Sequence, residues 1–413
     1  MREFFCPSSE ALCRFRSGPL EGHIHSYAEL LCRQGYTSEA GWDKIRAVSE
    51  LGCWLDQKHV GVEMLDEQQV AAFLKSRSGH VPRWSGEKAS LTLLLKHLRQ
   101  HHAIPACSVN THPTPTDAIA QSYQQFLLDE RGLGRNTIQG YIAVVRRFLF
   151  HRFPDGKVEM DKLRAKDIAA FVLHDTSNRG RKACQLATSV LRGLLRYLFH
   201  SGRIATNLAA SVPTVAGWRL SELPRYLETA EVEKILKTCD RRRRTGKRDY
   251  AMLLLLARLG LRAGEVARLT LDDIDWCTGE LRIHGKGGRI DRLPLLQPVG
   301  EAIADYLRKA RPRCPSRHLF VYAKAPYEGF SSPPNGICSL VRRTLKRAGL
   351  NPPHKGAHIL RHSLATTMLG NGASLVEIGR VLRHKGVQTT EIYAKVNLDA
   401  LRKLAQPWPG GDQ

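Results

Sequence analysis

Apolar residues recur at helical spacing along most of the first 210 residues. A helix brings every third or fourth residue to one face, and one such stripe is formed by Tyr141, Val144, Val145, Phe148 and Leu149. The period changes later, where Gly279 to His284 and Arg289 to Leu295 alternate between apolar and polar side chains around a glycine-rich turn. That alternation predicts a β-hairpin. We therefore predict a multidomain, mainly helical chain with a small sheet in a mixed α/β final domain.

Two polar, proline-containing stretches divide the chain. Residues 110–116 have the composition of a linker, and a second break follows the helical block at residues 211–221. We predict an N-terminal helical domain at 1–112, a second helical domain at 113–210, and a final domain at 222–413.

The first helical block resembles the second in sequence. Matching residues are separated by 96 to 100 positions, an offset that drifts as small loop insertions would make it drift. The clearest matches are Tyr27 with Tyr123, Phe73 with Phe171, Leu98 with Leu198 and Ile104 with Ile204. We predict that residues 25–106 duplicate the second domain. The alternative is that two amphipathic helical blocks align by chance.

Basic residues outnumber acidic residues by a wide margin. The 413-residue chain has 63 Lys and Arg against 39 Asp and Glu, a net charge of +24. Such a chain most often binds nucleic acid, and an anionic membrane surface is the weaker alternative. The longest apolar run, Ala251 to Ala257, is too short to span a bilayer. The N-terminus shows no apolar segment of the kind found in secretion signals. We therefore expect a cytoplasmic protein that associates with the nucleoid and does not bind a membrane.

The cysteines and carboxylates give no metal-binding pattern. The 10 cysteines are scattered and form no Cys-x-x-Cys pair, which is typical of reduced thiols. The nearest approach to a zinc site is the group Cys6, Cys13, His23, His25 and Cys32. Its spacing fits no common template. Asp272, Asp273 and Asp275 could suggest a two-metal nuclease, but no distant acidic partners stand out. We expect no metal and no cofactor.

Candidate chemistry begins at two basic residues in turns. The run Gly285-Lys286-Gly287-Gly288 fits neither common phosphate-loop pattern, which leaves Lys286 as a lysine at the tip of the hairpin. Arg262 lies in the turn that ends one apolar helix and opens another, where anions are favoured. Glu265 follows three residues later in the new helix.

Further candidates lie near the C-terminal end. His358 and Arg361 are three residues apart, so both project from one face of a helix. His384 precedes Tyr393 by nine residues. Such a set suits the cleavage of a phosphodiester without metal. Arginines clamp the non-bridging oxygens, nearby cations favour the phenolate, and a mobile lysine protonates the leaving oxygen.

These residues, in this order, resemble the tyrosine recombinase (phage integrase) family, with Xer-like spacing. The matching motifs are Gly-Leu-Arg-x-Gly-Glu, His-x-x-Arg-His-Ser and Leu-x-His-x(8)-Tyr, all within 222–397. Residues 113–210, with Asn136 and Tyr141, resemble the family's SAM-like core-binding domain. The first domain is covered only through the internal repeat, which would make it a second core-binding-like unit that binds DNA.

The resemblance implies a role for each basic motif residue. Arg262 and Arg361 would clamp the phosphate, and Lys286 would be the general acid. Glu265 stands where the family carries a carboxylate that supports the active-site arginine and histidine.

The resemblance also implies the nucleophile and its reaction. Tyr393 would take the 3′-phosphate and free a 5′-hydroxyl, so that neither ATP nor metal is needed. His358 would be the acid or base near this nucleophile, and His384 would donate a hydrogen bond to the phosphate. A tail helix at 396–404 would dock on a neighbouring protomer.

The implied activity is site-specific recombination of double-stranded DNA through a Holliday junction, as in an integrase or transposase of a mobile element. The family implies a homotetramer on two duplexes, and we expect the free protein to be mainly monomeric. The alternatives are a type IB topoisomerase-like enzyme or resolvase, and a catalytically silent DNA-binding regulator. The neighbours His362 and Ser363 are interpreted as helix packing and capping.

Overall fold

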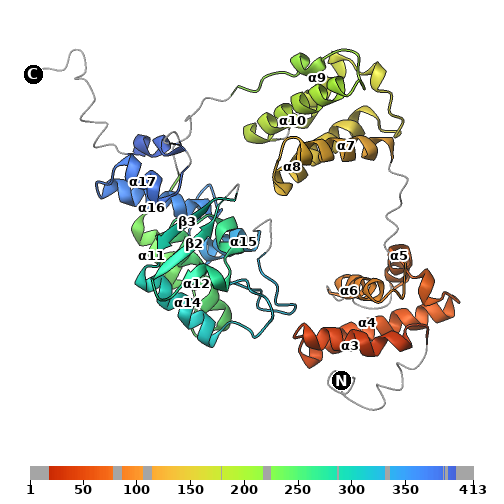
Figure 1. Cartoon of the computed structure of the whole chain (residues 1–413), viewed down its shortest axis with the longest axis horizontal. Coiled ribbons are helices and arrows are strands. Elements are labelled where there is room, and N and C mark those ends of the chain that lie inside the picture. The colour runs from red at the N-terminus through yellow and green to blue at the C-terminus, as the bar shows by residue number, and fades with distance from the viewer. Residues whose placement is uncertain are drawn as a thin grey trace, which may run out of the picture. The chain divides into compact units, whose positions relative to one another are not determined.

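The computed structural model describes residues 18–77, 86–105, 114–177, 179–216, 225–285, 288–330, 335–384, 386 and 389–396. The chain forms two compact units (Figure 1). One consists of 109–222, and the other groups 1–108 with 223–413. The boundary predicted near residue 112 and the linker predicted at 211–221 stay predictions.

The N-terminal segment is a small helical body. Its elements are α3 (Glu21–Arg33), α4 (Ser38–Gln57), the short 3-10 helix η1 (Val62–Met64), α5 (Glu67–Ser76) and α6 (Glu87–Gln100). Asp66 begins α5 by accepting hydrogen bonds from the backbone N–H groups of Gln68 and Gln69. The apolar stripes of these helices meet in a core of their own.

Residues 114–216 form a second helical body with the same order of elements. They are α7 (Pro115–Asp129), α8 (Arg135–Arg152), η2 (Met160–Lys162), α9 (Ala165–Thr176), α10 (Arg181–His200) and η3 (Leu208–Ser211). In both bodies a short 3-10 helix precedes the third helix. The matched residues of the repeat are also buried in both: Tyr27 and Tyr123, Phe73 and Phe171, Leu98 and Leu198, Ile104 and Ile204. Duplication would explain this agreement and remains a proposal.

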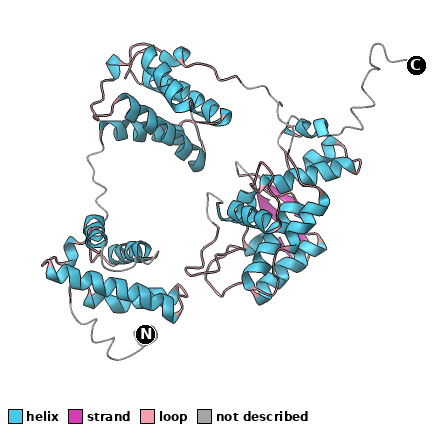
Figure 2. Cartoon of the chain, turned by 180° about the vertical axis from the view of Figure 1, so that it is seen from behind, coloured by secondary structure: helices cyan, strands magenta, loops and turns pink. Residues whose placement is uncertain are grey.

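The last segment is mixed, as predicted. It opens with α11 (Thr229–Lys237), α12 (Arg244–Arg258), α13 (Ala263–Arg268) and η4 (Leu271–Asp273), and continues with the strands β1 (Ile274–Asp275), β2 (Glu280–His284) and β3 (Ile290–Pro294). It ends with α14 (Gln297–Lys309), α15 (Asn335–Arg347), α16 (His358–Gly370), α17 (Leu375–Val381) and η6 (Glu391–Val396). Figure 2 shows strands in this body and helices around them.

The predicted hairpin is present. β1, β2 and β3 form an antiparallel sheet in that order, with Leu281 opposite Leu293. The backbone N–H of Gly285 donates to the carbonyl of Arg289 over 2.8 Å and closes the turn. Lys286, which the sequence predicts at the tip of the hairpin, lies outside the described residues.

The core of this body surrounds α12. Every residue from Ala251 to Ala257 is buried, and the helix packs against α14 and α16. A smaller apolar cluster beside it joins α16, α17 and η6 and contains Ala365, Ile378, Leu382 and Tyr393. The candidate tyrosine is thus part of a packed core. The tail helix predicted at 396–404 lies almost wholly outside the described residues.

Within the described residues, no helix is both long enough and apolar enough to cross a membrane.

Candidate active site

Arg262 is positioned by the sharp turn between α12 and α13. Gly260 ends α12 with a φ of +58°, and an added Cβ there would lie 2.7 Å from a methyl group of Leu382. Glycine is therefore required for both backbone and space. Arg262 then caps α13. Its backbone N–H donates to Glu265 Oε2 over 2.8 Å, and its guanidinium donates to Glu265 Oε1 over 2.7 Å.

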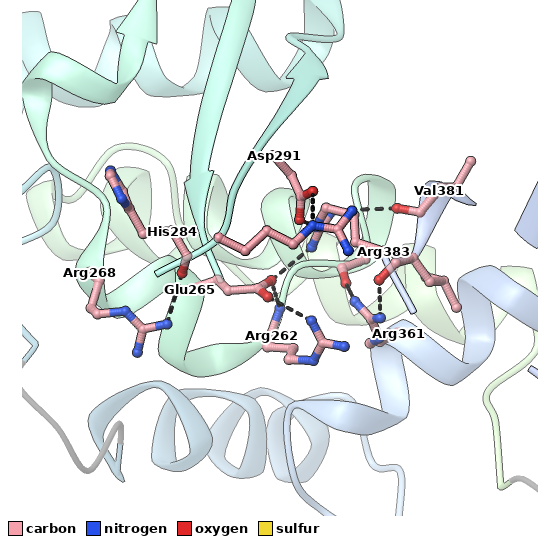
Figure 3. A network of polar contacts seen from close by, with 11 residues as sticks. Arg262, Glu265, Arg268, His284, Asp291, Arg361, Val381 and Arg383 are labelled. Carbon is pink, nitrogen blue, oxygen red and sulfur yellow. Dashed lines mark hydrogen bonds and ion pairs between the residues drawn. The ribbon is translucent and has the colours of Figure 1, made fainter. Parts of the chain in front are cut away.

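Glu265 is shared with a second arginine (Figure 3). The guanidinium of Arg383 donates to Glu265 Oε2 over 2.7 Å, and these two side chains are only 4% and 3% exposed. Burial alone would raise the pKa of the Glu265 carboxyl. The hydrogen bonds and charges of Arg262 and Arg383 outweigh burial and hold that pKa below its ordinary value, so the group is ionised at neutral pH.

Arg383 also reaches the hairpin. Its Nε lies 3.9 Å from Oδ2 of Asp291 on β3. Its backbone has a φ of +56°, in the left-handed region that favours glycine. A bulky residue held in this strained conformation is typical of a functional site, because the surrounding contacts must maintain it. Arg383 therefore links the loop after α17 to both α13 and the hairpin.

Arg361 belongs to the same cluster of arginines. It is buried on the first turn of α16, and its guanidinium donates to the carbonyl oxygens of Gly260 and Leu382. Burial, and then the charges of Arg262 and Arg383, lower its pKa to about 10, which leaves it cationic at neutral pH. Three arginines thus surround one carboxylate. The excess positive charge makes this a site for an anion.

Tyr393 lies against this cluster from η6. Its side chain is buried, and its hydroxyl lies 2.7 Å from Nδ1 of His362. Burial raises the pKa of Tyr393 to about 12, although the charges of Arg361 and Arg262 act in the opposite direction. The hydroxyl is therefore protonated in the free protein.

His384 lies beside the tyrosine, and His358 lies beside His362. The ring of His384 is parallel to that of Tyr393 with 6.5 Å between centroids, and its Nδ1 is 2.7 Å from Thr390 Oγ1. Burial, and then nearby arginines, lower the pKa of His384 to about 4, so it is neutral at pH 7. His358 is exposed at the start of α16, with its ring centroid 6.2 Å from that of His362.

The structure thus gathers Arg262, Glu265, Arg361, His384 and Tyr393, with His358 at the edge. Lys286 lies outside the described residues.

Two further residues were missed or misassigned by sequence reasoning. His362 was interpreted as helix packing, but it contacts the Tyr393 hydroxyl. Its place directly after Arg361 was the available signal. Arg383 carries no visible signal, because a positive φ cannot be read from the residue type. Ser363 lies inside α16 and caps neither α16 nor α11; its Oγ accepts from the backbone N–H of Leu227 over 2.8 Å and so joins α16 to the segment before α11.

The acidic run at 272–275 has structural partners. Asp272 pairs with Arg317, Asp273 accepts from the backbone N–H of Thr270, and Asp275 accepts from the backbone of the following turn. In the part of the chain that the structure describes, no group of three or more His, Cys, Asp or Glu could hold a metal ion.

Known proteins resemble this chain over most or all of its length. The phage integrase family matches residues 225–399, and the phage integrase N-terminal SAM-like domain matches residues 120–202. Over the whole length of both proteins, the chain is 45% identical to y4rA of Sinorhizobium fredii. That relative is provisionally named an integrase/recombinase. It is 31% identical to the tyrosine recombinase XerD of Listeria monocytogenes, over 67% of this chain and 94% of that protein.

Solved structures share the fold. The XerH recombinase bound to its palindromic difH substrate in a post-cleavage complex matches with a TM-score of 0.56 and 20% identity, over 82% of this chain and 94% of that one. A λ integrase fragment, solved as a dimer on a COC′ core site, matches with a TM-score of 0.52 and 18% identity, over 71% and 98%.

A buried tyrosine thus lies beside clustered arginines on a fold that solved recombinases share. The chain belongs to the tyrosine recombinase (phage integrase) family, and is a site-specific recombinase.

The shared carboxylate makes a stability prediction. Glu265→Gln should lower the free energy of unfolding by roughly 3 kcal/mol, because it leaves two arginines without their buried counter-charge. Glu233→Gln is the matched control, since Glu233 pairs with Arg258 on the exposed surface and should cost less than about 1 kcal/mol. Urea denaturation of the two variants measures both. Equal losses would contradict the central place of Glu265.

Proposed function

We propose that this recombinase belongs to a mobile element and cuts and rejoins double-stranded DNA through a 3′-phosphotyrosyl intermediate. The observation that carries the proposal is the position of Tyr393, whose ring lies against an arginine cluster with excess positive charge. A phosphate bound by these arginines would lie close to the tyrosine. The reaction needs no ATP because the phosphotyrosyl bond retains the energy of the broken phosphodiester.

Cleavage is a transesterification at phosphorus. The Tyr393 Oη attacks the scissile phosphate, the bond from phosphorus to O5′ breaks, and Lys286 gives the leaving oxygen a proton. Arg262 and Arg361 hold the non-bridging oxygens, and positive charge fixed in advance lowers the barrier. In the reverse step a 5′-hydroxyl of a partner strand attacks phosphorus and releases the tyrosine.

The remaining motif residues have supporting roles in this scheme. His384 donates a hydrogen bond to the phosphate, and His358 is the acid or base at the outer edge of the site. Glu265 orients Arg262, a role supported by its two hydrogen bonds to that residue. Because Tyr393 is only 1% exposed, η6 must shift when DNA binds before the hydroxyl can reach phosphorus.

The assembly follows the solved relatives. A λ integrase dimer sits on one core site, which supports two protomers on each duplex and four on two duplexes. We propose a homotetrameric synapse of this kind, assembled on DNA from free monomers, in the cytoplasm at the nucleoid. The Holliday junction is the intermediate between the two strand exchanges.

The charge that would bind DNA is unevenly distributed. Residues 1–112 contain 13 basic and 12 acidic residues, whereas 113–210 contain 15 and 8, and 211–413 contain 35 and 19. As a second DNA-binding unit, which the sequence predicts, the N-terminal domain would contact phosphates through Lys88, Lys96, Arg99, His101 and His102. Arg99, however, forms two hydrogen bonds to Glu67. We propose that this domain is a duplicated core-binding fold that contributes less to DNA affinity than the second domain, because its charges nearly balance.

The proposal is tested with a nicked suicide substrate, on which release of a short fragment traps the covalent adduct. A recombinase forms the adduct on its own site and not on unrelated DNA. Relaxation of any supercoiled plasmid would indicate a topoisomerase instead. If no adduct forms on any DNA sequence that flanks the mobile element, the protein is a catalytically silent regulator.

Tyr393→Phe should abolish adduct formation while site binding is retained. The substitution removes one oxygen and leaves every charge of the site in place. Denaturing gel electrophoresis of labelled DNA detects the adduct, and a mobility shift on intact DNA measures binding. Any residual adduct in the variant would remove Tyr393 from the reaction.

Lys286→Ala should cleave slowly on normal DNA and much faster when sulfur replaces the leaving 5′-oxygen. A thiolate departs without a proton, so the general acid becomes unnecessary. Single-turnover cleavage rates on the two substrates, compared with those of the unmodified protein, measure the rescue. An equal defect on both substrates would show that Lys286 is not the acid.

Arg196 and Lys96 are exposed residues at equivalent positions of the repeat, 100 residues apart. Arg196→Ala should reduce the slope of log affinity against log salt by about 1, since one phosphate contact is lost. Lys96→Ala should leave the slope unchanged. Titrations at several salt concentrations give both slopes, and an equal reduction would mean that the N-terminal domain binds DNA as the second domain does.

A further inference from the structure

We propose that His362 is the general base that takes the proton from the Tyr393 hydroxyl. The inference rests on the proposed function and adds a catalytic residue to it. His362 Nδ1 and Tyr393 Oη are 2.7 Å apart, within the 2.6–3.2 Å range of a proton transfer along a hydrogen bond. Both residues belong to the contact between α16 and η6, beside the cluster that packs Ala365 against Tyr393.

Other groups near the tyrosine are committed elsewhere. His384 Nδ1 is 2.7 Å from Thr390 Oγ1, and its ring lies parallel to the tyrosine ring instead of pointing at the hydroxyl. Arg361 is a cation at neutral pH and therefore cannot accept a proton. His358 is exposed and lies one helical turn before His362. Within the described ranges, His362 is the side chain that hydrogen-bonds to the Tyr393 hydroxyl.

The direction of the hydrogen bond follows from protonation. Burial, and then His358, Arg361 and His354, lower the pKa of His362 to about 4, so its ring is neutral at pH 7. Tyr393 is protonated at that pH because burial raises its pKa. The hydroxyl therefore donates, and Nδ1 accepts with its lone pair while the ring proton is on Nε2.

The proton balance of the step closes. As the bond from Oη to phosphorus forms, the hydroxyl proton moves to Nδ1, and the bond to O5′ breaks with a proton supplied by Lys286. A DNA phosphate in the arginine cluster raises the pKa of the neighbouring histidine, since an anion stabilises the imidazolium. On religation the imidazolium returns its proton to the departing Tyr393 oxygen.

The position of His362 on α16 suits this role. Successive residues on a helix point about 100° apart, so Arg361 can hold the phosphate while its neighbour faces the nucleophile. His362 thus places the base and one arm of the clamp on a single rigid element. Such placement fixes a proton acceptor better than a loop does.

The test uses the full-length protein on the nicked suicide substrate. His362→Gln keeps a polar side chain of similar reach but removes the basic nitrogen. Its single-turnover cleavage should be slower by about 100-fold or more, within the range for loss of a general base. Binding to intact DNA and thermal unfolding should match the unmodified protein. Cleavage at the normal rate would overturn the proposal.

A second measurement separates base catalysis from packing. A fluorinated tyrosine with a more acidic hydroxyl is placed at position 393 in the otherwise unchanged protein, in His362→Gln and, as control, in Lys286→Ala, whose defect lies at the leaving oxygen. A more acidic phenol needs less help from a base, so it should restore cleavage in His362→Gln by about tenfold more than in the control. Equal restoration in both variants would show that His362 only supports the fold. Because Tyr393→Phe tests the nucleophile separately, failure here would leave the proposed function standing.

Discussion

A single buried carboxylate holds the site together. Glu265 accepts hydrogen bonds from Arg262 and from Arg383, and so joins the start of α13 to the loop after α17. Arg262 comes from the turn after α12, and Arg383 comes from the loop that continues to His384. Without this carboxylate, the arginine cluster would face its own repulsion in a region that is largely withdrawn from water. Glu265 therefore keeps the arginines close together when no phosphate is bound.

The same arrangement couples the nucleophile to its clamp. Arg361 donates to the carbonyl of Gly260 on one side and to that of Leu382 on the other, so it joins the end of α12 to the end of α17. Tyr393 and Leu382 belong to the same small apolar cluster. In the proposed mechanism, a shift of η6 on DNA binding would therefore be transmitted to the residues proposed to hold the phosphate. The buried position would also cover the proposed nucleophile until DNA binds.

Much of this could be predicted from the sequence, for physical reasons. Helical periodicity gave the helical bodies, because burying one face of each helix requires it, and alternation gave the hairpin from Glu280 to Pro294. The motif residues were found because their types and order match a family. Contacts made by tertiary folding were not visible. His362 turns toward Tyr393 only once η6 packs on α16, and Arg383 depends on a left-handed backbone that no residue type announces.

The central claim is that Tyr393 becomes bonded to the 3′-phosphate of cut DNA. Digestion of the trapped adduct with trypsin and nuclease should leave a nucleotide on the peptide of residues 386–395, in which Tyr393 is the only tyrosine. Fragmentation by mass spectrometry then locates the modified residue. The account predicts a 3′-linked nucleotide on Tyr393 and a free 5′-hydroxyl on the other DNA product. A nucleotide on any other residue, or linkage through a 5′-phosphate, would contradict it.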